Sequence, residues 1–216
     1  KRVGALAARG SEGDLMGAIL VLLERRGFEL KAASLQAVST ARRLADATGD
    51  GVVALAFGSG AASSADLAGA HGADRLLAVD DATLDLYAPE IYAATLANAA
   101  EESAADTILA AATSLGRDVS ARTCARLGTG LLSDVIAIER AAGGALRGKR
   151  PVYSGKAYAW AAVPDARPSM ATLRPNVFPA VSGGRRTVEV VGFAPASVPR
   201  RAAVVRLQKP AAQEQD

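Results

Sequence analysis

Apolar residues in the first part of the chain fall alternately into short unbroken runs and longer stretches with helical spacing. Short unbroken apolar runs are typical of strands that are covered on both faces, as in parallel sheets. The longer stretches place apolar residues every three or four positions, which is typical of helices with one buried face. The expected strands are Ala18–Leu23, Val52–Phe57, Arg75–Val79 and Ile108–Ala112.

Helix start and stop signals support this interpretation. Ser34 can act as an N-cap, Gly49 as a stop, and Pro89 suits a first helical turn. Because parallel strands need crossover helices between them, the alternation predicts an α/β domain, Rossmann-like, with a mainly parallel sheet flanked by helices. The expected helices run from Ser34 to about Gly49, through Leu67 to Ala70, from Pro89 to about Ser103 and from Asp118 to Leu127.

The pattern changes after Asp134, where short strand-like segments follow one another with only brief turns between them. Such spacing is typical of antiparallel strands, so we expect an antiparallel strand extension after about residue 139. The expected strands are Val135–Ile138, Pro151–Ser154, Ala157–Val163 and Met170–Arg174, with further candidates at Thr187–Val191 and Ala203–Leu207.

The two ends of the chain differ in character from the part between them. Residues 1–17 suggest a flexible extension, and Met16 is a candidate for the natural start. Residues 18–181 are expected to form the α/β domain. Residues 182–216 are expected to hold terminal strands and a linker that leads towards a further domain.

Composition limits the classes of site. The chain of 216 residues has one cysteine and one histidine, so neither an internal disulfide nor a zinc site is expected. No apolar run reaches the ~20 residues that cross a bilayer, so no membrane insertion is expected. These features favour the bacterial cytoplasm.

Charge is distributed unevenly along the chain. Residues 1–139 carry 12 basic and 18 acidic side chains, whereas residues 140–209 carry 13 basic and 2 acidic ones. Such asymmetry indicates that the C-terminal part faces something acidic. The basic residues are scattered singly, without a recognition helix or an aromatic stacking platform. A protein contact is therefore favoured over nucleic acid.

Two turns are candidates for a nucleotide site, because ligands of doubly wound sheets bind at the carboxyl ends of strands. Gly58 and Gly60 could let backbone amides approach a phosphate, although an ordinary strand-to-helix turn explains them as well. In the second turn Gly116 allows tight chain reversal and Asp118 can cap the next helix. The candidates of this second turn are Thr113, Gly116, Arg117 and Asp118.

No catalytic residues are expected. Cys124 lies in an amphipathic stretch and suits a core position, and His71 suits a helix end. Asp134 could pair with Lys149, Arg150 or Lys156, or bond a ribose hydroxyl. Structural pairing is the preferred explanation. The candidates for residues that face a partner are Arg122, Asp134, Arg150, Tyr153, Lys156 and Arg174.

Four phrases carry a family resemblance through their order. They are ILVLLERRGFELKAASLQAVSTARRLAD, ILAAATSLGRDVSARTCARLGTGLLSDVIAI, RPVYSGKAYA and ATLRPNVFPAV, which lie between about Ala18 and Val181. In this order they resemble the N-terminal domain of the electron transfer flavoprotein alpha subunit. The resemblance implies an adenine nucleotide alpha hydrolase-like fold.

The resemblance also implies a function. Such an alpha subunit forms a heterodimer with an electron transfer flavoprotein beta subunit. The heterodimer carries electrons from flavin dehydrogenases, such as those of fatty acid oxidation, to a downstream acceptor. The family binds FAD through a C-terminal domain of the alpha subunit, and the motifs of that domain are absent from this sequence. No cofactor is therefore expected in this chain alone.

Two functions stay open at this point. The chain could be the scaffold and partner-docking domain of an alpha subunit, with its basic strands against the beta subunit or the FAD domain. It could instead be a free-standing module of the same fold that binds an adenine nucleotide near Gly58–Gly60 and Gly116–Asp118. The two differ in whether the isolated chain binds nucleotide.

Overall fold

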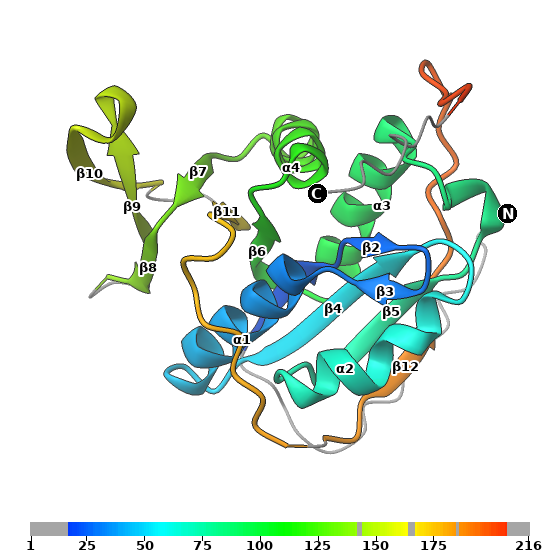
Figure 1. The fold of residues 1–216 in the computed structure, drawn as a ribbon, viewed down its shortest axis with the longest axis horizontal. Coiled ribbons are helices and arrows are strands. Elements are labelled where there is room, and N and C mark those ends of the chain that lie inside the picture. The colour runs from blue at the N-terminus through cyan, green and yellow to red at the C-terminus, as the bar shows by residue number, and fades with distance from the viewer. Residues whose placement is uncertain (1–16, 142–143, 164–166, 185, 207–216) are drawn as a thin grey trace, which may run out of the picture.

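The computed structural model describes residues 17–141, 144–163, 167–184 and 186–206. Seven strands form one sheet in the order β12-β5-β4-β1-β6-β11-β7, and every neighbouring pair is parallel (Figure 1). The strands are β1 (Ala18–Leu22), β4 (Gly51–Phe57), β5 (Arg75–Val79), β6 (Ala105–Ala111), β7 (Leu131–Val135), β11 (Ser169–Leu173) and β12 (Glu189–Gly192). The predicted Rossmann-like α/β fold with a mainly parallel sheet is therefore confirmed.

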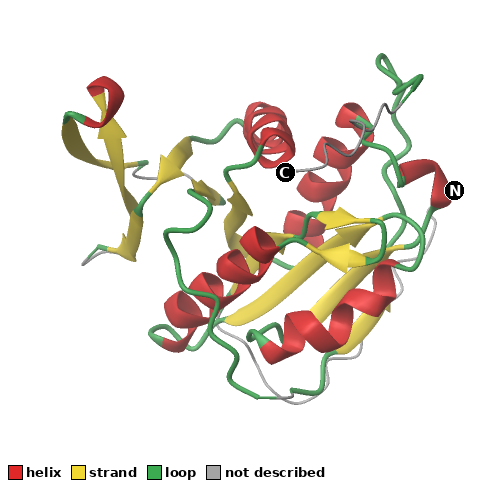
Figure 2. Ribbon diagram, in the orientation of Figure 1, coloured by secondary structure: helices red, strands yellow, loops and turns green. Residues whose placement is uncertain are grey.

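Four α-helices cover the two faces of this sheet (Figure 2). They are α1 (Ala32–Asp46), α2 (Ala65–Ala70), α3 (Pro89–Glu102) and α4 (Ser114–Leu127). Helices α1 and α2 pack on one face, and α3 and α4 pack on the other. Because both faces are covered, the central strands are buried along their whole length, which explains their unbroken apolar runs.

Two predicted helix caps were wrong. Helix α4 begins at Ser114, four residues before Asp118, because the hydroxyl of Thr113 accepts a hydrogen bond of 3.0 Å from the Gly116 amide and caps the helix there. Ser34 lies inside α1, where its hydroxyl accepts a bond of 2.7 Å from the Glu24 amide. The Thr113 hydroxyl therefore caps its own helix, whereas the Ser34 hydroxyl binds the backbone of Glu24, which precedes its helix.

The strands near the C-terminus are distributed differently from the prediction. The segment expected over Met170–Arg174 is β11, which lies between β6 and β7 in the parallel sheet and not in the antiparallel extension. All five of its residues are buried, as a central strand requires. The candidate Thr187–Val191 is present as β12, which pairs with β5, so the large sheet extends past residue 181. Residues 203–206 form no strand, and Leu207 lies outside the described residues.

The antiparallel extension is a separate small sheet of β8 (Ala137–Arg140), β9 (Leu146–Val152) and β10 (Ala157–Ala162). It projects from the end of the large sheet beyond β7 (Figure 1). Gly148 lets it approach closely, because a Cβ there would lie 2.5 Å from a methyl carbon of Val135.

A minimal hairpin of β2 (Arg25–Arg26) and β3 (Glu29–Leu30) follows β1. Three short 3₁₀ turns complete the structure, at Ala61–Ser64, Ala82–Leu84 and Tyr153–Gly155.

A buried arginine joins the small sheet to the large one. The Nη2 atom of Arg140, at the end of β8, lies 2.9 Å from Asp106 Oδ1 and 3.2 Å from Asp50 Oδ2. The side chain of Arg140 is 13% exposed and that of Asp50 is 6% exposed. Burial opposes ionisation of Asp106, but its hydrogen bonds from Arg140 and Thr107 prevail and lower its pKa. Asp106 has a second cation, because the exposed Arg167 places its Nη1 atom 3.1 Å from Asp106 Oδ2, whereas Arg140 is the cation that Asp50 depends on.

Two further predictions concern the N-terminal residues and the absence of a membrane-spanning segment. The flexible extension, apart from Gly17, and the proposed start at Met16 fall outside the described residues. Within the part of the chain that is described, no helix has both the length and the apolar character needed to cross a bilayer.

Replacement of Arg140 by methionine tests the role of this buried network. The variant keeps a similar length but leaves the buried Asp50 without its cation, while Asp106 keeps the exposed Arg167, so the free energy of unfolding should fall by about 3 kcal/mol. Urea denaturation followed by circular dichroism measures the loss. The matched control is Arg122→Met, which removes an exposed pair with Asp118 and should cost less than about 1 kcal/mol. Equal losses in the two variants would contradict a structural role for the network.

Candidate functional site

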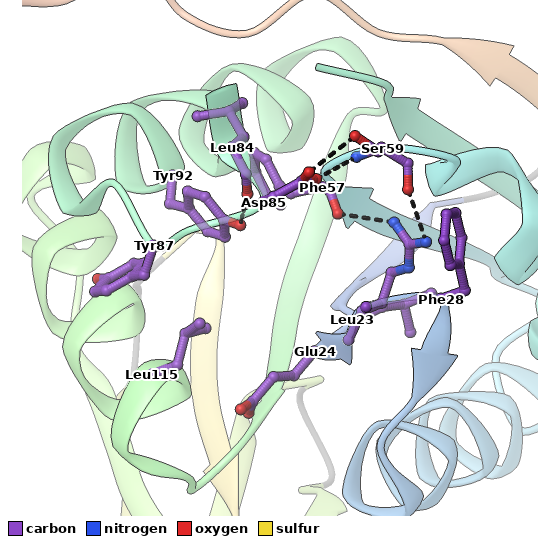
Figure 3. A pocket seen from close by; sticks show the side chains of 12 residues that line it. Leu23, Glu24, Phe28, Phe57, Ser59, Leu84, Asp85, Tyr87, Tyr92 and Leu115 are labelled. Carbon is purple, nitrogen blue, oxygen red and sulfur yellow. Dashed lines mark hydrogen bonds between the residues drawn. The ribbon is translucent and has the colours of Figure 1, made fainter. Parts of the chain in front are cut away.

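The strand order reverses next to β1, and this reversal creates a potential binding site. From β1 the chain adds β4 and β5 on one side, and then crosses to place β6 on the other. In such sheets ligands bind outside the carboxyl ends of the strands at this switch point. A pocket of about 190 Å³ lies there (Figure 3). It is lined by Leu23, Glu24, Arg25, Gly27, Phe28, Phe57, Ser59, Leu84, Asp85, Tyr87, Tyr92 and Leu115.

The carbonyl groups of the turn after β4 are bound by Arg25. Its Nη1 atom donates to the carbonyl of Phe57 at 3.0 Å and to that of Gly58 at 3.4 Å. Its Nη2 atom donates to the carbonyls of Ser59 and Gly60 at 3.0 and 3.1 Å. One guanidinium group thus holds four successive carbonyl groups, and it comes from β2, the short strand that follows β1.

The amide groups of the same turn are bound by carboxylates of the chain itself. Asp85 accepts from the Ser59 amide at 2.6 Å and from the Ser59 hydroxyl at 2.9 Å, and Asp80 accepts from the Gly60 amide at 2.9 Å (Figure 3 shows the Asp85 bonds). The Gly58 amide donates to the carbonyl of Val79. A phosphate at this turn would need these same amides and would meet two negative charges. The amides of Gly58, Ser59 and Gly60 are therefore already hydrogen-bonded to other groups of the chain.

The predicted candidates of the second turn form a structural cluster. The hydroxyl of Thr113 donates to Glu24 Oε2 at 2.5 Å while it caps α4. Glu24 is 8% exposed, and its other carboxylate oxygen pairs with Lys31. Gly116 packs tightly, because a Cβ there would lie 2.0 Å from the carbonyl oxygen of Ala111. These contacts join the carboxyl ends of β1 and β6 across the switch point.

Arg117 and Asp118 are not among the residues that line the pocket. Asp118 accepts hydrogen bonds from the hydroxyl of Tyr87 at 2.5 Å and from Arg122 Nε at 2.9 Å. Burial and the Asp118 contact raise the pKa of Tyr87 well above its ordinary value. Arg117 is exposed and lies 3.7 Å from Asp134. The second turn therefore contributes Leu115 to the lining of the pocket, and the charged groups of Arg117 and Asp118 lie outside that lining.

Aromatic rings form the other wall of the pocket. Phe57 and Tyr92 are stacked with centroids 4.0 Å apart, and Tyr87 meets Tyr92 edge-on at 5.1 Å. The hydroxyl of Tyr92 donates to the carbonyl of Leu84 at 2.7 Å, and burial raises the pKa of Tyr92 to about 12. Both tyrosine hydroxyls are thus held as donors to the protein and stay protonated at neutral pH.

Asp134 has a structural partner that differs from the predicted ones. It makes a bidentate pair with Arg174, with Nε–Oδ1 at 3.1 Å and Nη2–Oδ2 at 2.6 Å, so Lys149, Arg150 and Lys156 are not its hydrogen-bond partners. This pairing lowers the pKa of Asp134 against the opposing effect of burial. Asp134 lies at a backbone irregularity in β7 with φ of 57°. The pair joins β7 to the residue after β11.

The other partner-facing candidates are spread over two surfaces. Arg122 is exposed on α4 beside Asp118. Tyr153 and Lys156 are exposed in the turn between β9 and β10. Arg150 is half-buried on the inner side of the small sheet, where its charge also lowers the pKa of Asp134. The structure does not bring these residues together into one patch.

The site residues Glu24, Arg25, Asp80 and Asp85 were not predicted from the sequence. A signal was available, because Glu24 and Arg25 directly follow the strand expected over Ala18–Leu23, and Asp80 directly follows the strand expected over Arg75–Val79. Carboxyl ends of parallel strands meet at one edge, so charged residues at these positions were candidates to meet there. The sequence does not indicate that they would bind each other's loops instead of a ligand.

Groups that could support catalysis are engaged in structural contacts. His71 Nδ1 lies 3.2 Å from the hydroxyl of Ser39, which also bonds the backbone of Val181. Burial raises the pKa of the Cys124 thiol, which reduces its nucleophilic form. Among the described residues, no three His, Cys, Asp or Glu side chains gather in a way that could hold a metal ion.

The fold and the site define a class of protein: a doubly wound, Rossmann-like α/β domain whose turn after β4 is hydrogen-bonded by side chains of the chain itself. Comparison with known proteins identifies the family. The electron transfer flavoprotein domain matches residues 19–198, and the chain belongs to this family.

Curated relatives agree with this assignment. Protein FixB of Clostridium saccharobutylicum is 38% identical over 165 residues, which are 76% of this chain and 49% of the relative. The electron transfer flavoprotein alpha subunit of Thermoanaerobacterium thermosaccharolyticum is 34% identical over 177 residues, 81% of this chain and 53% of the relative. That of Bacillus subtilis is 33% identical over 159 residues, 73% of this chain and 47% of the relative. The chain thus spans about half the length of these relatives, and the predicted resemblance to the alpha subunit's N-terminal domain is confirmed.

The family name implies a flavin, so the fit of the switch-point site to FAD matters. The pyrophosphate of a dinucleotide binds free backbone amides at such a turn. Here the amides of Ser59 and Gly60 are bound to Asp85 and Asp80. The residues of this site therefore do not fit FAD.

Gly116→Ala tests whether this residue is needed for packing. Alanine is the better helix former, so propensity alone would stabilise the variant by about 1 kcal/mol. The clash with the Ala111 carbonyl should instead lower the free energy of unfolding by about 1–3 kcal/mol, measured by urea denaturation. Gly192→Ala is the control, because a Cβ there meets open space and the change should stay within about 0.5 kcal/mol. A more stable Gly116→Ala protein would contradict the packing role.

Proposed function

We propose that this chain is the scaffold and partner-docking domain of an electron transfer flavoprotein alpha subunit. Together with a beta subunit, that protein carries electrons from flavin dehydrogenases to a downstream acceptor. FAD is held by a different domain of the parent protein, because the switch-point turn of this chain offers it no free amides. We further propose a bacterial cytoplasmic location, which fits a chain with a single cysteine.

One observation carries this proposal. The turn at Gly58–Gly60 has its carbonyl groups bound by Arg25 and its amides bound by Val79, Asp80 and Asp85. A nucleotide would have to displace these charge-assisted hydrogen bonds, which are stronger than neutral ones. The domain has a fold that nucleotide-binding proteins also use, but its own side chains form the hydrogen bonds of the turn after β4. Such a domain is suited to be a rigid framework.

The alternative function is a free-standing adenine-nucleotide-binding module. The apolar pocket with the rings of Phe57, Tyr87 and Tyr92 is the observation in its favour, because such walls suit a flat base. The carboxylates of Glu24 and Asp85 in the same lining disfavour the phosphates that any nucleotide carries. The scaffold function is therefore the better supported of the two.

Titration with AMP and ATP separates the two functions. We expect no saturable binding below millimolar concentrations in isothermal titration calorimetry, because the phosphate-binding amides are already used. The free nucleoside adenosine serves as a control that lacks the phosphate repulsion. Micromolar binding of AMP or ATP by the wild-type chain would overturn the scaffold proposal in favour of the nucleotide module.

Complex formation with a beta-type subunit tests the docking proposal directly. The chain and the electron transfer flavoprotein beta subunit of the same organism, purified separately, should elute as one species in size-exclusion chromatography with light scattering. An unrelated flavodoxin-like protein of similar size is the negative control. Separate elution of chain and beta subunit at micromolar concentrations would refute the docking role.

A further inference from the structure

A second and larger cavity lies at the edge of the large sheet opposite the switch point. It has a volume of about 530 Å³ and is bounded by the C-terminal parts of α1 and α2 and by the segment that connects β11 to β12. Because α1 leads into β4 and α2 into β5, the cavity lies at the amino ends of the strands. Figure 1 shows the connecting segment as it passes α1. Small-molecule sites usually measure about 300–1,000 Å³, a range that this cavity meets and the switch-point pocket does not.

One wall of this cavity is apolar. It is formed by Phe178, Pro179 and Val181 of the connecting segment and by Ala70 of α2. Phe178 also packs in the hydrophobic core, so the wall is fixed to the body of the domain. A Cβ at Gly183, which also lines the cavity, would meet no atom within 4 Å, so this glycine leaves the space beside the wall open.

Hydrogen bonds attach the connecting segment to both helices. The hydroxyl of Ser39 in α1 accepts from the Val181 amide at 3.0 Å and donates to the Val181 carbonyl at 3.2 Å. The Gly183 amide donates to the carbonyl of Ala70 in α2 at 2.9 Å. The cavity is therefore held open by contacts of the chain itself, and such pre-organisation lowers the cost of binding.

The charged groups around the cavity are mainly positive. Three arginines line it, Arg42, Arg43 and Arg186, together with one carboxylate, Asp46. Asp74 accepts from Arg42 at 2.8 Å and from Arg186 at 2.9 Å, and so holds these two guanidinium groups in place. Arg43 is exposed in the last turn of α1 and takes part in none of the ion pairs between described residues. Three positive charges thus face two negative ones, which favours an anion over a cation.

The neighbouring helix ends limit the charge of that anion. Phosphate groups are typically held by free backbone amides at the N-terminus of a helix. This cavity is instead bordered by the C-terminal ends of α1 and α2, where the helix dipole is negative. The Gly183 amide is already bonded to Ala70. The cavity therefore suits a singly charged carboxylate better than a doubly charged phosphate.

We propose that this cavity binds a small organic carboxylate with an apolar body. The carboxylate lies at Arg43 and Arg186, and the apolar body lies against Phe178, Pro179 and Val181. Guanidinium groups match carboxylates in geometry as well as in charge, and an apolar wall with a few polar groups is typical of small-molecule sites. This inference goes beyond the docking function proposed above and does not depend on it.

NMR titration of the chain with phenylacetate tests the site. His71 lines the cavity and is the only histidine of the chain, so its imidazole signals report on this place without overlap. Phenylacetate should shift these signals saturably with a Kd of about 1 mM or below, which a ligand of this size can reach. The uncharged phenylacetamide and the smaller acetate should each bind at least tenfold more weakly, because one lacks the charge and the other the apolar body.

Two variants and a matched control locate the site. Arg43→Gln removes a cation and Val181→Asp places a negative charge on the apolar wall, so each should raise the Kd for phenylacetate at least tenfold. The bonds between Val181 and Ser39 use the backbone of Val181, so the second variant keeps the connecting segment attached. Arg126→Gln changes an exposed arginine in the last turn of α4, on the other face of the sheet, and should change the Kd less than twofold. Urea midpoints check that all three variants are folded.

The possible outcomes are distinguishable. No saturable shift of the His71 signals in the wild-type chain, or equal affinity for phenylacetate and phenylacetamide, would overturn the proposal. Unchanged affinity in both Arg43→Gln and Val181→Asp would place the probe elsewhere and overturn it as well. Tighter binding of inorganic phosphate than of phenylacetate would overturn the carboxylate class in favour of a phosphorylated ligand. None of these results changes the outcome of complex formation with the beta subunit, which tests the docking function separately.

Discussion

The buried guanidinium of Arg140 fixes how the two sheets of this protein sit relative to each other. It comes from β8 of the small sheet and binds Asp50, which lies just before β4, and Asp106, which is the second residue of β6. Isolated buried charges are costly, so Arg140 and Asp50 depend on each other here, whereas Asp106 also pairs with the exposed Arg167. The close approach of Gly148 to Val135 adds a packing contact nearby. Together they hold the projecting sheet in one orientation.

At the carboxyl edge of the large sheet, polar groups are likewise paired with other groups of the same chain. Arg25, Asp80 and Asp85 satisfy the backbone of Gly58–Gly60 from two different loops. These contacts hold the turn in place without a ligand.

Much of the fold could be predicted from the sequence, because each central strand is an unbroken apolar run and each crossover helix has helical spacing. β11 was assigned to the wrong sheet, since its pairing with β6 is a long-range contact that Ser169–Leu173 does not encode locally. The cap of α4 was misplaced because Thr113 and Asp118 are both good capping residues. At the site the turn at Gly58–Gly60 was predicted, but its occupation by Arg25 and Asp85 was not. Those residues are far from the turn in the sequence, and the formation of the sheet brings them to it.

Composition alone overstates the basic character of the C-terminal part, and the structure shows where the charge is left over. Arg140 and Arg174 are held by carboxylates of the large sheet, and Arg147 is held by Glu139 within its own sheet. Salt would screen exposed pairs such as Arg147 with Glu139 much more than the buried Arg140 network. The other basic side chains of the small sheet are Lys149, Arg150 and Lys156, of which Lys156 is exposed and the other two are half-buried.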